Sequence, residues 1–207
     1  MSRWISRKPD YHSDIMVALP HFVTSSCALL ATGYAELMQK NEGTIPSKNG
    51  LDISRFGSVM GNLALAALTL ESTCTVRIAG EGVRERFSHK LVGTNYYSLV
   101  NPALRSNTMQ SIDMVVSTPC AYRVEMLQKY DNGEEYRIEF CAFPLLSDEP
   151  GVDGFIIFAD GEIDQMRPAA TIRPVLIQSQ VIQRELIDLG FGLDESFEDL
   201  VPSAPLP

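Results

Sequence analysis

The sequence predicts an α+β protein built around an antiparallel β-sheet. Two alternating segments, 120–130 and 134–146, flank Asp131-Asn132-Gly133, and Asn-Gly is the strongest short-range signal for a β-hairpin. An apolar run at 63–70 passes through a short turn into an alternating segment at 73–79. These strands connect as hairpins or meanders, without the strand–helix–strand repeat that is typical of a parallel sheet.

The first predicted helix begins near residue 26. Ser25 or Ser26 is a suitable N-cap, and Gly43 and Pro46 end the helix. Its apolar positions recur at spacings of three and four residues: Cys27, Leu30, Ala31, Tyr34, Leu37 and Met38. A loop and a short helix then lead to the first strand, and this short helix carries Ile53, Phe56, Val59 and Met60.

Between the two pairs of strands the chain is mainly helical. Gly80-Glu81-Gly82 leads to a short helix that extends to about His89, and a Gly-Thr turn then precedes another short helical piece. A longer helix is predicted between Pro102, near its first turn, and Pro119, which stops it. One face of this helix carries Leu104, Thr108, Ile112 and Val115, with Met109 and Val116 beside it.

The two strands of the predicted hairpin each have an apolar face and a charged face. The apolar positions are Tyr122, Val124 and Met126 on the first strand and Tyr136, Ile138, Phe140 and Ala142 on the second. The opposite face carries the pairs Arg123/Glu125 and Arg137/Glu139, which we expect to be solvated or to pair across the strands. A final apolar strand is expected at 155–161.

The C-terminal region has the pattern of an amphipathic helix. Pro174 lies near its predicted start and Gly190 beyond its end. The apolar positions of this predicted helix are Val175, Leu176, Val181, Ile182, Leu186 and Leu189. The tail that follows is acidic and rich in proline, so we expect it to be disordered or loosely attached.

The segment 75–94 raises the question of phosphate binding, because a strand runs into Gly80-Glu81-Gly82 and then into a helix. A dinucleotide-binding turn needs a third small residue, and Glu85 stands at that position. A carboxylate there repels phosphate. The two glycines are instead expected to let the chain leave a strand at φ values that other residues avoid.

The same segment resembles bacterial PAS domains. The matching residues are Arg77-Ile78-Ala79-Gly80 and Leu91-Val92-Gly93-Thr94, and the run 136–158 is similar to the last two strands of that family, with Pro144-Leu145 closing one strand and Val152-Asp153 leading into the next. Upstream, 45–68 looks like the loop, short helix and first strand of the family. The resemblance covers about residues 27 to 165 and rests on the order and spacing of motifs that are individually weak.

The resemblance implies a PAS-like five-stranded antiparallel sheet with short helices on one face, plus N- and C-terminal flanking helices. Such domains leave an apolar cavity between sheet and helices, where many of them bind a small molecule or cofactor. A flanking helix often covers the other face, frequently through dimerisation. We therefore divide the chain into an N-terminal extension (1–26), a PAS-like domain with its N-terminal flanking helix (27–165), a C-terminal amphipathic helix (166–192) and a tail (193–207).

Eight side chains are the candidates for lining such a cavity: Phe87, Tyr97, Met109, Ile112, Tyr122, Val124, Ile138 and Phe140. A close-packed core is the alternative, since protein interiors are packed by default. The two tyrosines are the more suggestive members, because a buried hydroxyl must find a hydrogen-bond partner and a ligand can supply one. The sequence does not identify a cofactor.

Metal and catalytic chemistry find little support. His89 is more typical of a surface histidine than of a haem ligand, and His12 and His21 have no metal-ligand spacing. The reactive cysteine of flavin photoreceptors is absent from residues 82–100. No nucleophile elbow, zinc-protease motif or P-loop is present, and the resemblance carries no catalytic signature, so we expect no enzymatic activity.

The composition limits the kinds of partner that this protein can bind and indicates its cellular location. The net charge of -9 argues against nucleic-acid binding, which depends on Lys and Arg neutralising phosphates. Cys27, Cys74, Cys120 and Cys141 form no C-x-x-C pair and are expected to be free and buried. Asp10, Asp14, Pro20 and His21 interrupt the apolar stretch near the N-terminus, so neither a signal peptide nor a membrane span is predicted, and a cytoplasmic location is expected.

The sequence thus predicts a bacterial PAS-like sensory module that acts through a protein partner in a signalling pathway. A homodimer through the flanking helices and a small apolar ligand are further expectations. The alternatives are a small enzyme or nucleotide-binding protein that uses the Gly80-Glu81-Gly82 turn, and a purely structural dimerisation domain.

Overall fold

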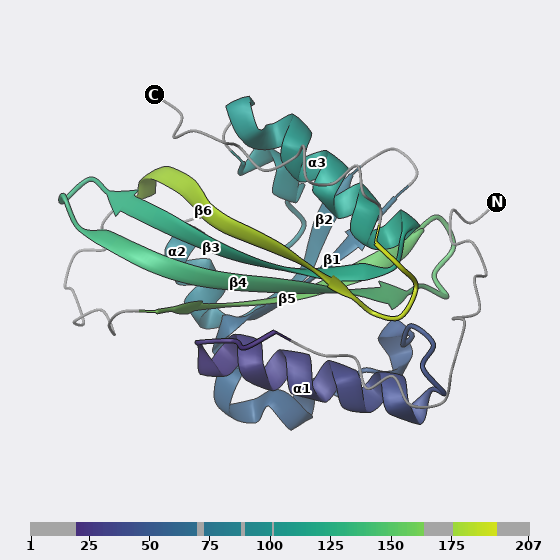
Figure 1. Ribbon diagram of the computed structural model, residues 1–207. Helices are drawn as coiled ribbons and strands as arrows, with labels where there is room; N and C mark the ends of the chain where they lie inside the picture. Colours follow the sequence, from purple (N-terminus) through teal and green to yellow (C-terminus); the bar gives the residue numbers. More distant parts are fainter. Residues whose placement is uncertain (1–19, 70–72, 88–89, 101, 164–175, 194–207) are drawn as a thin grey trace.

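The computed structural model describes residues 20–69, 73–87, 90–100, 102–163 and 176–193. A six-stranded sheet in the order β2-β1-β5-β4-β3-β6 forms the middle layer, and every pair of neighbouring strands is antiparallel. Helix α3 lies over one face of the sheet and α1 lies across the other (Figure 1). The antiparallel α+β class predicted from the sequence is confirmed.

The elements follow the predicted order except at the C-terminus. The helices are α1 (Ser25–Lys40), η1 (Lys48–Gly50), η2 (Ile53–Asn62), α2 (Glu81–Phe87), η3 (Tyr96–Ser98) and α3 (Pro102–Ser117). The strands are β1 (Leu63–Leu68), β2 (Cys74–Ala79), β3 (Cys120–Tyr130), β4 (Glu135–Leu146), β5 (Gly154–Glu162) and β6 (Leu176–Asp188). Strands β1 to β5 with their short helices form the PAS-like arrangement that was expected, and β6 is added to it at the edge beside β3.

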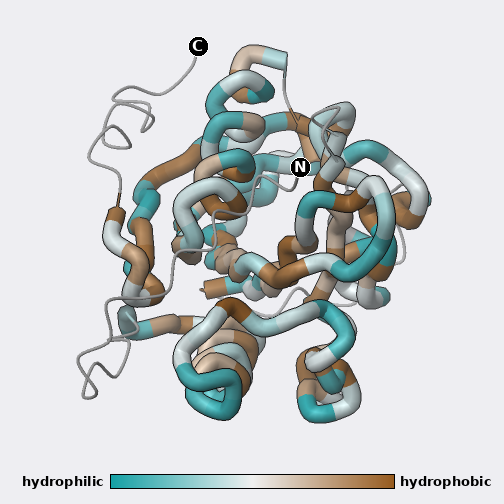
Figure 2. Tube along the Cα trace, turned by 90° about the vertical axis from the view of Figure 1, so that its right-hand side faces the viewer, coloured by the Kyte–Doolittle hydropathy of each residue, from teal (hydrophilic) through white to brown (hydrophobic). Residues whose placement is uncertain are grey.

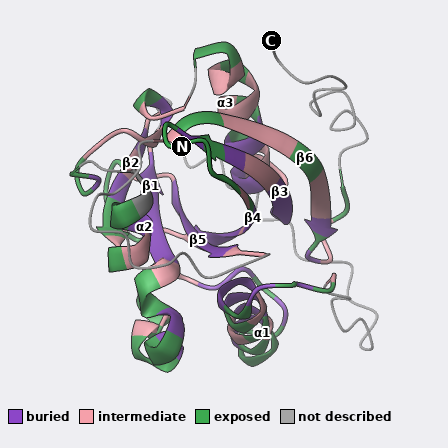
Figure 3. Ribbon diagram, turned by 90° about the vertical axis from the view of Figure 1, so that its left-hand side faces the viewer, coloured by how far each residue is buried: buried purple, intermediate pink, exposed green. Residues whose placement is uncertain are grey.

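Alternate residues of each strand face opposite helices, which divides the core in two. In β1, Leu63, Leu65 and Ala67 pack in the cluster beneath α1, whereas Ala64, Ala66 and Leu68 pack in the cluster beneath α3. Both faces of the sheet are therefore covered, and β1 is buried throughout, as are residues 154–161 of β5 (Figure 3). Figure 2 shows hydrophobic segments, in brown, in the middle of the molecule. We refer to the two sides as the α1 face and the α3 face.

The predicted N-terminal helix is present as α1, and it covers its own sheet. Its buried positions include all six of the apolar residues predicted from the spacing: Cys27, Leu30, Ala31, Tyr34, Leu37 and Met38. The predicted caps were wrong by one residue, since Thr24 occupies the N-cap position and makes no side-chain capping bond. After Lys40 the chain turns through Gly43, whose φ is 76° and whose N–H donates to the Met38 carbonyl at 2.8 Å.

The N-terminus of α1 is tied to the sheet by the carboxylate of Glu139. Its Oε1 accepts from the Val23 N–H at 3.0 Å and from Arg123 Nε at 2.6 Å. Its Oε2 accepts from the N–H and the hydroxyl of Thr24, both at 2.7 Å. Glu139 is 0 % exposed and Arg123 7 %, so this ion pair lies inside the protein.

The charged face of the β3–β4 hairpin is therefore partly buried. Cross-strand pairing was predicted correctly: Arg123 bonds to Glu139, and Arg137 bonds to Glu125. The other alternative, that these charges are solvated, does not hold for Arg123, Glu125 and Glu139, which are buried on the face of the sheet that α1 covers. The turn itself agrees with the sequence, since Gly133 has a φ of 83° and its N–H donates to the Tyr130 carbonyl at 2.9 Å.

The predicted C-terminal helix is wrong: residues 176–188 form the strand β6, which pairs with β3 along its whole length. The apolar pairs 176–177, 181–182 and 186–187 recur every five residues, which suits neither a regular helix nor a regular strand. Two register shifts resolve the conflict, because β6 skips Ile182 and Ile177 when it pairs with β3. Both skipped residues are exposed. The rest of the predicted helix, at 166–175, lies outside the described residues.

Gly80 and Gly82 allow two segments of backbone to approach each other. A Cβ added at Gly80 would lie 2.2 Å from the Met60 carbonyl oxygen and 2.3 Å from that of Gly61. A Cβ added at Gly82 would lie 2.5 Å from the Asn62 side chain. Neither glycine has a positive φ, so the expectation of unusual backbone angles was wrong, and close contact with the end of η2 is the reason for both residues.

Two further expectations concern thiols and membranes. All four cysteines are free and buried, as predicted. Among the described residues, no helix combines the length and apolar character needed to cross a bilayer. The extension 1–19 and the tail 194–207 lie outside the described residues.

The contact at Gly80 predicts a strong difference between two glycine substitutions. Gly80→Ala should destabilise the protein by about 1–3 kcal/mol or more, because the new methyl group meets backbone carbonyls that cannot rotate away. Gly57→Ala is the matched control, since nothing lies within 4 Å of its Cβ position. Urea unfolding of both variants measures the effect, and equal stabilities would contradict this account of the turn.

The buried Glu139 predicts a stability that depends on pH. Burial alone raises the pKa of this carboxyl, but the hydrogen bonds from Val23, Thr24 and Arg123 outweigh it, and the pKa is lowered. The carboxylate therefore stabilises the fold above the pKa of the unfolded chain, about 4.3 for Glu, and this contribution is lost as the pH falls through the lower folded value.

Glu139→Gln should cost about 3 kcal/mol of unfolding free energy at neutral pH, because it leaves Arg123 buried without its counter-ion. The difference from wild type should shrink as the pH falls through the lowered pKa. Glu135→Gln is the control, since its ion pair with Lys129 is exposed, and it should change stability by less than about 1 kcal/mol. A gap that stays constant into the acid range would show that the Glu139 carboxylate is not responsible.

Candidate functional site

Helix α3 separates two hollows on its side of the sheet. The first, which we call the α3–β6 cavity, has a volume of about 140 Å³. It is lined by Tyr96, Leu99 and Val100, by Leu104, Thr108 and Ser111 of α3, and by sheet residues Tyr122, Val124, Met126, Gln128, Phe140, Leu176, Ser179, Val181 and Arg184. The second, the β1–β2 pocket, has a volume of about 220 Å³ and lies on the other side of α3.

The alternation of side chains along β3 and β6 determines which residues line the α3–β6 cavity. Every second residue of β3 from Tyr122 to Gln128 points to the α3 face, and Val124 stands opposite Phe140 on one side and Arg184 on the other. The register shift at Ile182 then returns Val181 to this face opposite Met126. Without that extra residue Val181 would point away from the cavity, since a one-residue slip reverses every side chain.

The cavity is mainly apolar, and its polar groups are concentrated around Arg184. Nη1 of Arg184 donates to the Ser111 hydroxyl at 2.8 Å, and that hydroxyl donates to the Asn107 carbonyl at 2.7 Å. Nε of Arg184 is buried and has no hydrogen-bond partner within the described part of the chain. Burial lowers the pKa of this guanidinium, because the charged form loses water contacts without gaining a counter-ion.

Two tyrosines place hydroxyl groups beside the same guanidinium. Burial raises the pKa of Tyr96 to about 12 and raises that of Tyr122 well above its usual value, whereas the positive charge of Arg184 acts in the opposite direction on both. The two phenols therefore remain protonated near neutral pH and can donate hydrogen bonds. The ring of Tyr122 stacks on Phe140 at a centroid distance of 5.8 Å.

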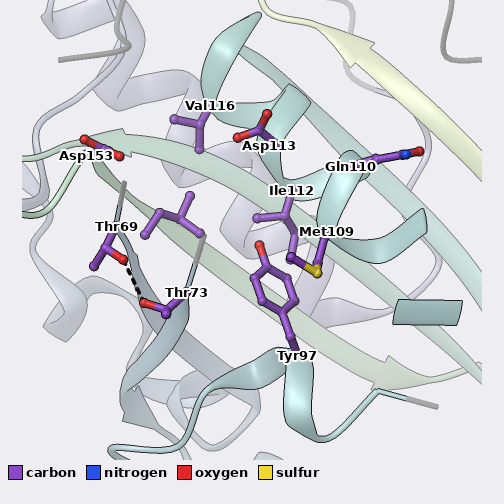
Figure 4. Close-up of a pocket in the computed structure, with 10 residues that line it drawn as sticks. Thr69, Thr73, Tyr97, Met109, Gln110, Ile112, Asp113, Val116 and Asp153 are labelled. Atoms are coloured by element: carbon purple, nitrogen blue, oxygen red, sulfur yellow. Dashed lines mark hydrogen bonds between the residues drawn. The ribbon is translucent and has the colours of Figure 1, made fainter. Parts of the chain in front are cut away.

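The β1–β2 pocket is more polar. Figure 4 shows Tyr97, Met109, Ile112 and Asp113 directed into it, with Thr69 and Thr73 on the opposite wall. The two threonine hydroxyls are 2.8 Å apart and hydrogen-bond to each other. Burial raises the pKa of Tyr97, and the Cys74 thiol and the Asp113 carboxylate raise it further, so this phenol too stays protonated.

The structure places six of the eight predicted residues in the two hollows. Tyr122, Val124 and Phe140 line the α3–β6 cavity. Met109 and Ile112 of α3 line the β1–β2 pocket together with Tyr97 of η3. Ile138 is buried but lines neither hollow, and Phe87 is the last residue of α2 with a side chain outside the described part of the chain. Ligand binding by these residues stays a prediction.

Sequence reasoning missed the polar group of the cavity. Arg184 and Val181 lie on β6, and the incorrect helix assignment left no way to decide which face they occupy. Ser111 sits beside predicted Ile112 on α3, and Tyr96 precedes predicted Tyr97. The sequence would have placed Arg184 on the same face as Val181 and Leu186 only if the bulge at Ile182 had been known.

The glycine turn is poorly suited to phosphate. The N–H of Gly80 already donates to the Leu63 carbonyl at 2.8 Å. The space beside Gly80 is occupied by the carbonyl oxygens of Met60 and Gly61, which repel anions. This geometry counts against the nucleotide-binding alternative. In the described ranges no three His, Cys, Asp or Glu side chains are grouped to hold a metal ion, and His89 lies outside those ranges.

No family model and no curated protein sequence matches the chain. Solved structures with a similar fold include VqmA of Vibrio cholerae in a complex with ligand and DNA, at 17% identity and a TM-score of 0.40, covering 55% of this chain and 52% of that one. A PAS domain from Colwellia psychrerythraea matches at 13% identity and a TM-score of 0.37, with 54% of this chain and 98% of the other covered.

A LOV protein from Rhodobacter sphaeroides matches at 14% identity and a TM-score of 0.39, covering 56% and 70% of the two chains. The match spans about half the length of the VqmA chain. PAS and LOV domains are thus among the structures that this chain resembles in fold.

Proposed function

We propose that this chain is a sensory module with a PAS-like fold and no catalytic activity of its own, which binds a small, largely apolar ligand in the α3–β6 cavity and acts through a protein partner. The observation that carries the proposal is the cavity itself. Protein interiors are normally filled, and voids larger than a water molecule are few. A hollow of about 140 Å³ that converges on one guanidinium and two phenols is the usual form of a ligand site.

The cavity volume limits the ligand to about one ring. An apolar cavity of about 150 Å³ accommodates benzene, so a hollow of about 140 Å³ is comparable with the space that one ring needs. Phe140, Val124 and Met126 provide an apolar wall, and Tyr122 offers a ring face for stacking. A flavin or a haem is far larger than this space.

The position of β6 supports a route from ligand to partner. This strand contributes Val181 and Arg184 to the cavity, and it is also the last strand of the sheet. A ligand that binds one arrangement of β6 better than another shifts the population between them. Ile177 and Ile182, which are exposed at the two bulges, would report such a change at the surface.

We also propose a homodimer, but α1 has little exposed apolar surface with which to form its interface. The apolar side of α1 packs on the sheet of its own chain, and the predicted C-terminal helix is replaced by β6 over residues 176–188. A second copy would therefore contact a different surface from the flanking helices that the sequence indicated.

Phenol serves as a one-ring probe for the cavity. It should shift backbone amide resonances around Val124 and Val181 and should raise the melting temperature. Val181→Phe fills the cavity and should weaken phenol binding at least about tenfold, since the added ring occupies the space of the ligand. Ile182→Phe is the matched control on the same strand, where the side chain is exposed and binding should be unchanged.

Native mass spectrometry of the purified protein tests the same site without a chosen probe. A bound mass of one-ring size that is lost in Val181→Phe and kept in Ile182→Phe is the expected result. If wild type binds neither phenol nor a co-purified molecule, the ligand half of the proposal is wrong and only an adaptor role remains.

A further inference from the structure

Arg184 has no partner of opposite charge in the cavity. Among the described residues that line the α3–β6 cavity it is the only charged one, and the group that it contacts is the neutral Ser111 hydroxyl, at 2.8 Å. The edge of the guanidinium that bears Nε makes no hydrogen bond to the described residues. A partly buried guanidinium with a buried, unpaired Nε and no counter-ion in the cavity is costly, so this arrangement favours a ligand that supplies one.

The carboxylates nearest in the sheet and in α3 are separated from Arg184. Arg184, Val124, Phe140 and Asp160 stand in one row across β6, β3, β4 and β5, so Asp160 is three strands away, about 14 Å. Asp160 faces the same side of the sheet, where its negative charge contributes to the raised pKa of Tyr96. Glu185 points to the opposite face of the sheet, since it stands across from Arg123. Asp113, two residues after Ser111 in α3, is directed into the β1–β2 pocket (Figure 4).

The phenols complete a set of donors. Tyr96 and Tyr122 remain protonated because burial raises the pKa of both groups. Their hydroxyls make no hydrogen bond to other groups in the part of the chain that is described, and like Arg184 they line the cavity. One guanidinium and two hydroxyl donors next to an apolar wall match a ring that carries an acceptor group with negative charge.

We infer that the ligand of the α3–β6 cavity is a one-ring organic acid whose carboxylate binds Arg184, with its ring against Val124 and Phe140. This inference rests on the proposed function, because it assigns the chemical class of the ligand for the same cavity. A carboxylate accepts two parallel hydrogen bonds from one edge of a guanidinium, which gives both affinity and orientation. The phenols of Tyr96 and Tyr122 donate to the remaining lone pairs.

The experiment compares benzoate with benzamide, which has nearly the same shape but no charge. Isothermal titration of the wild-type protein should show benzoate binding at least about tenfold more tightly, since hydrogen bonds to a charged partner are stronger than those between neutral groups. Equal affinities, or a preference for benzamide, would overturn the assignment without any variant being needed.

Substitutions of Arg184 test whether this residue causes the preference for benzoate over benzamide. Arg184→Met should remove it, so that benzoate and benzamide bind alike, and Arg184→Lys should keep part of it, because the charge remains but the paired donors are lost. Arg55→Met, at a half-exposed arginine that pairs with Glu36 outside the cavity, is the control and should keep the wild-type preference. Far-UV circular dichroism establishes that each variant is folded.

Phenol binding tests the proposed function separately from the assignment of an organic acid as the ligand. If phenol binds and is excluded by Val181→Phe while benzoate shows no preference over benzamide, the cavity is a ligand site and the acid assignment is wrong. If benzoate preference persists in folded Arg184→Met, Arg184 is not the anchor. If neither phenol nor benzoate binds, both the function and the assignment fail.

Discussion

The buried carboxylate of Glu139 is the interaction on which the arrangement of layers depends. A charge with 0 % exposure is tolerated only when nearly all of its lone pairs are satisfied, and here Val23, Thr24 and Arg123 supply the donors. Two of these donor residues belong to the segment that starts α1, and the third belongs to β3. The same carboxylate therefore fixes the helix to the sheet and compensates the charge of Arg123.

Close backbone contact supports this attachment. The Ser26 hydroxyl donates to the Asp160 carbonyl at 2.6 Å, and a Cβ at Gly161 would lie 2.7 Å from the side chain of Thr24. Only glycine leaves room for the start of α1 at this point of β5. With α1 fixed over one face, the sheet needs no second subunit to cover that face, and the opposite face is left to α3 and the two hollows beside it.

Much of the fold follows from local patterns, and the failures have physical causes. The β3–β4 hairpin was predictable because Asn132-Gly133 and strict alternation agree. The faces of α1 and α3 were predictable from their spacing. β6 was not, because two bulges at Ile177 and Ile182 break the period of two and leave apolar pairs at intervals of five residues. Nothing in the sequence marks a bulge before the partner strand is known.

The candidate site was predictable only as a set of inward residues. Tyr122, Val124 and Phe140 follow from strand alternation, and all three do line the cavity. Their separation from Tyr97, Met109 and Ile112 depends on how α3 crosses the sheet, which is a tertiary property. The same holds for Gly80. The sequence indicates that glycine is required there, but only the fold shows that the backbone of Met60 and Gly61, and not a phosphate, lies next to it.

The two arginines of the paired strands β3 and β6 show how the sheet treats charge on its two faces. Arg123 points to the α1 face, where Glu139 accepts its hydrogen bond at 2.6 Å and the charge is neutralised within the chain. Arg184 stands opposite the next residue of β3, Val124, and points to the α3 face, where Ser111 is a neutral partner. Arg123 is buried and is neutralised within the chain, whereas Arg184 is partly buried and only its Nε lacks a hydrogen-bond partner among the described residues. These two neighbouring positions therefore differ in what they contribute: the charge of Arg123 stabilises the fold through Glu139, whereas the charge of Arg184 is the one to which we assign the proposed ligand.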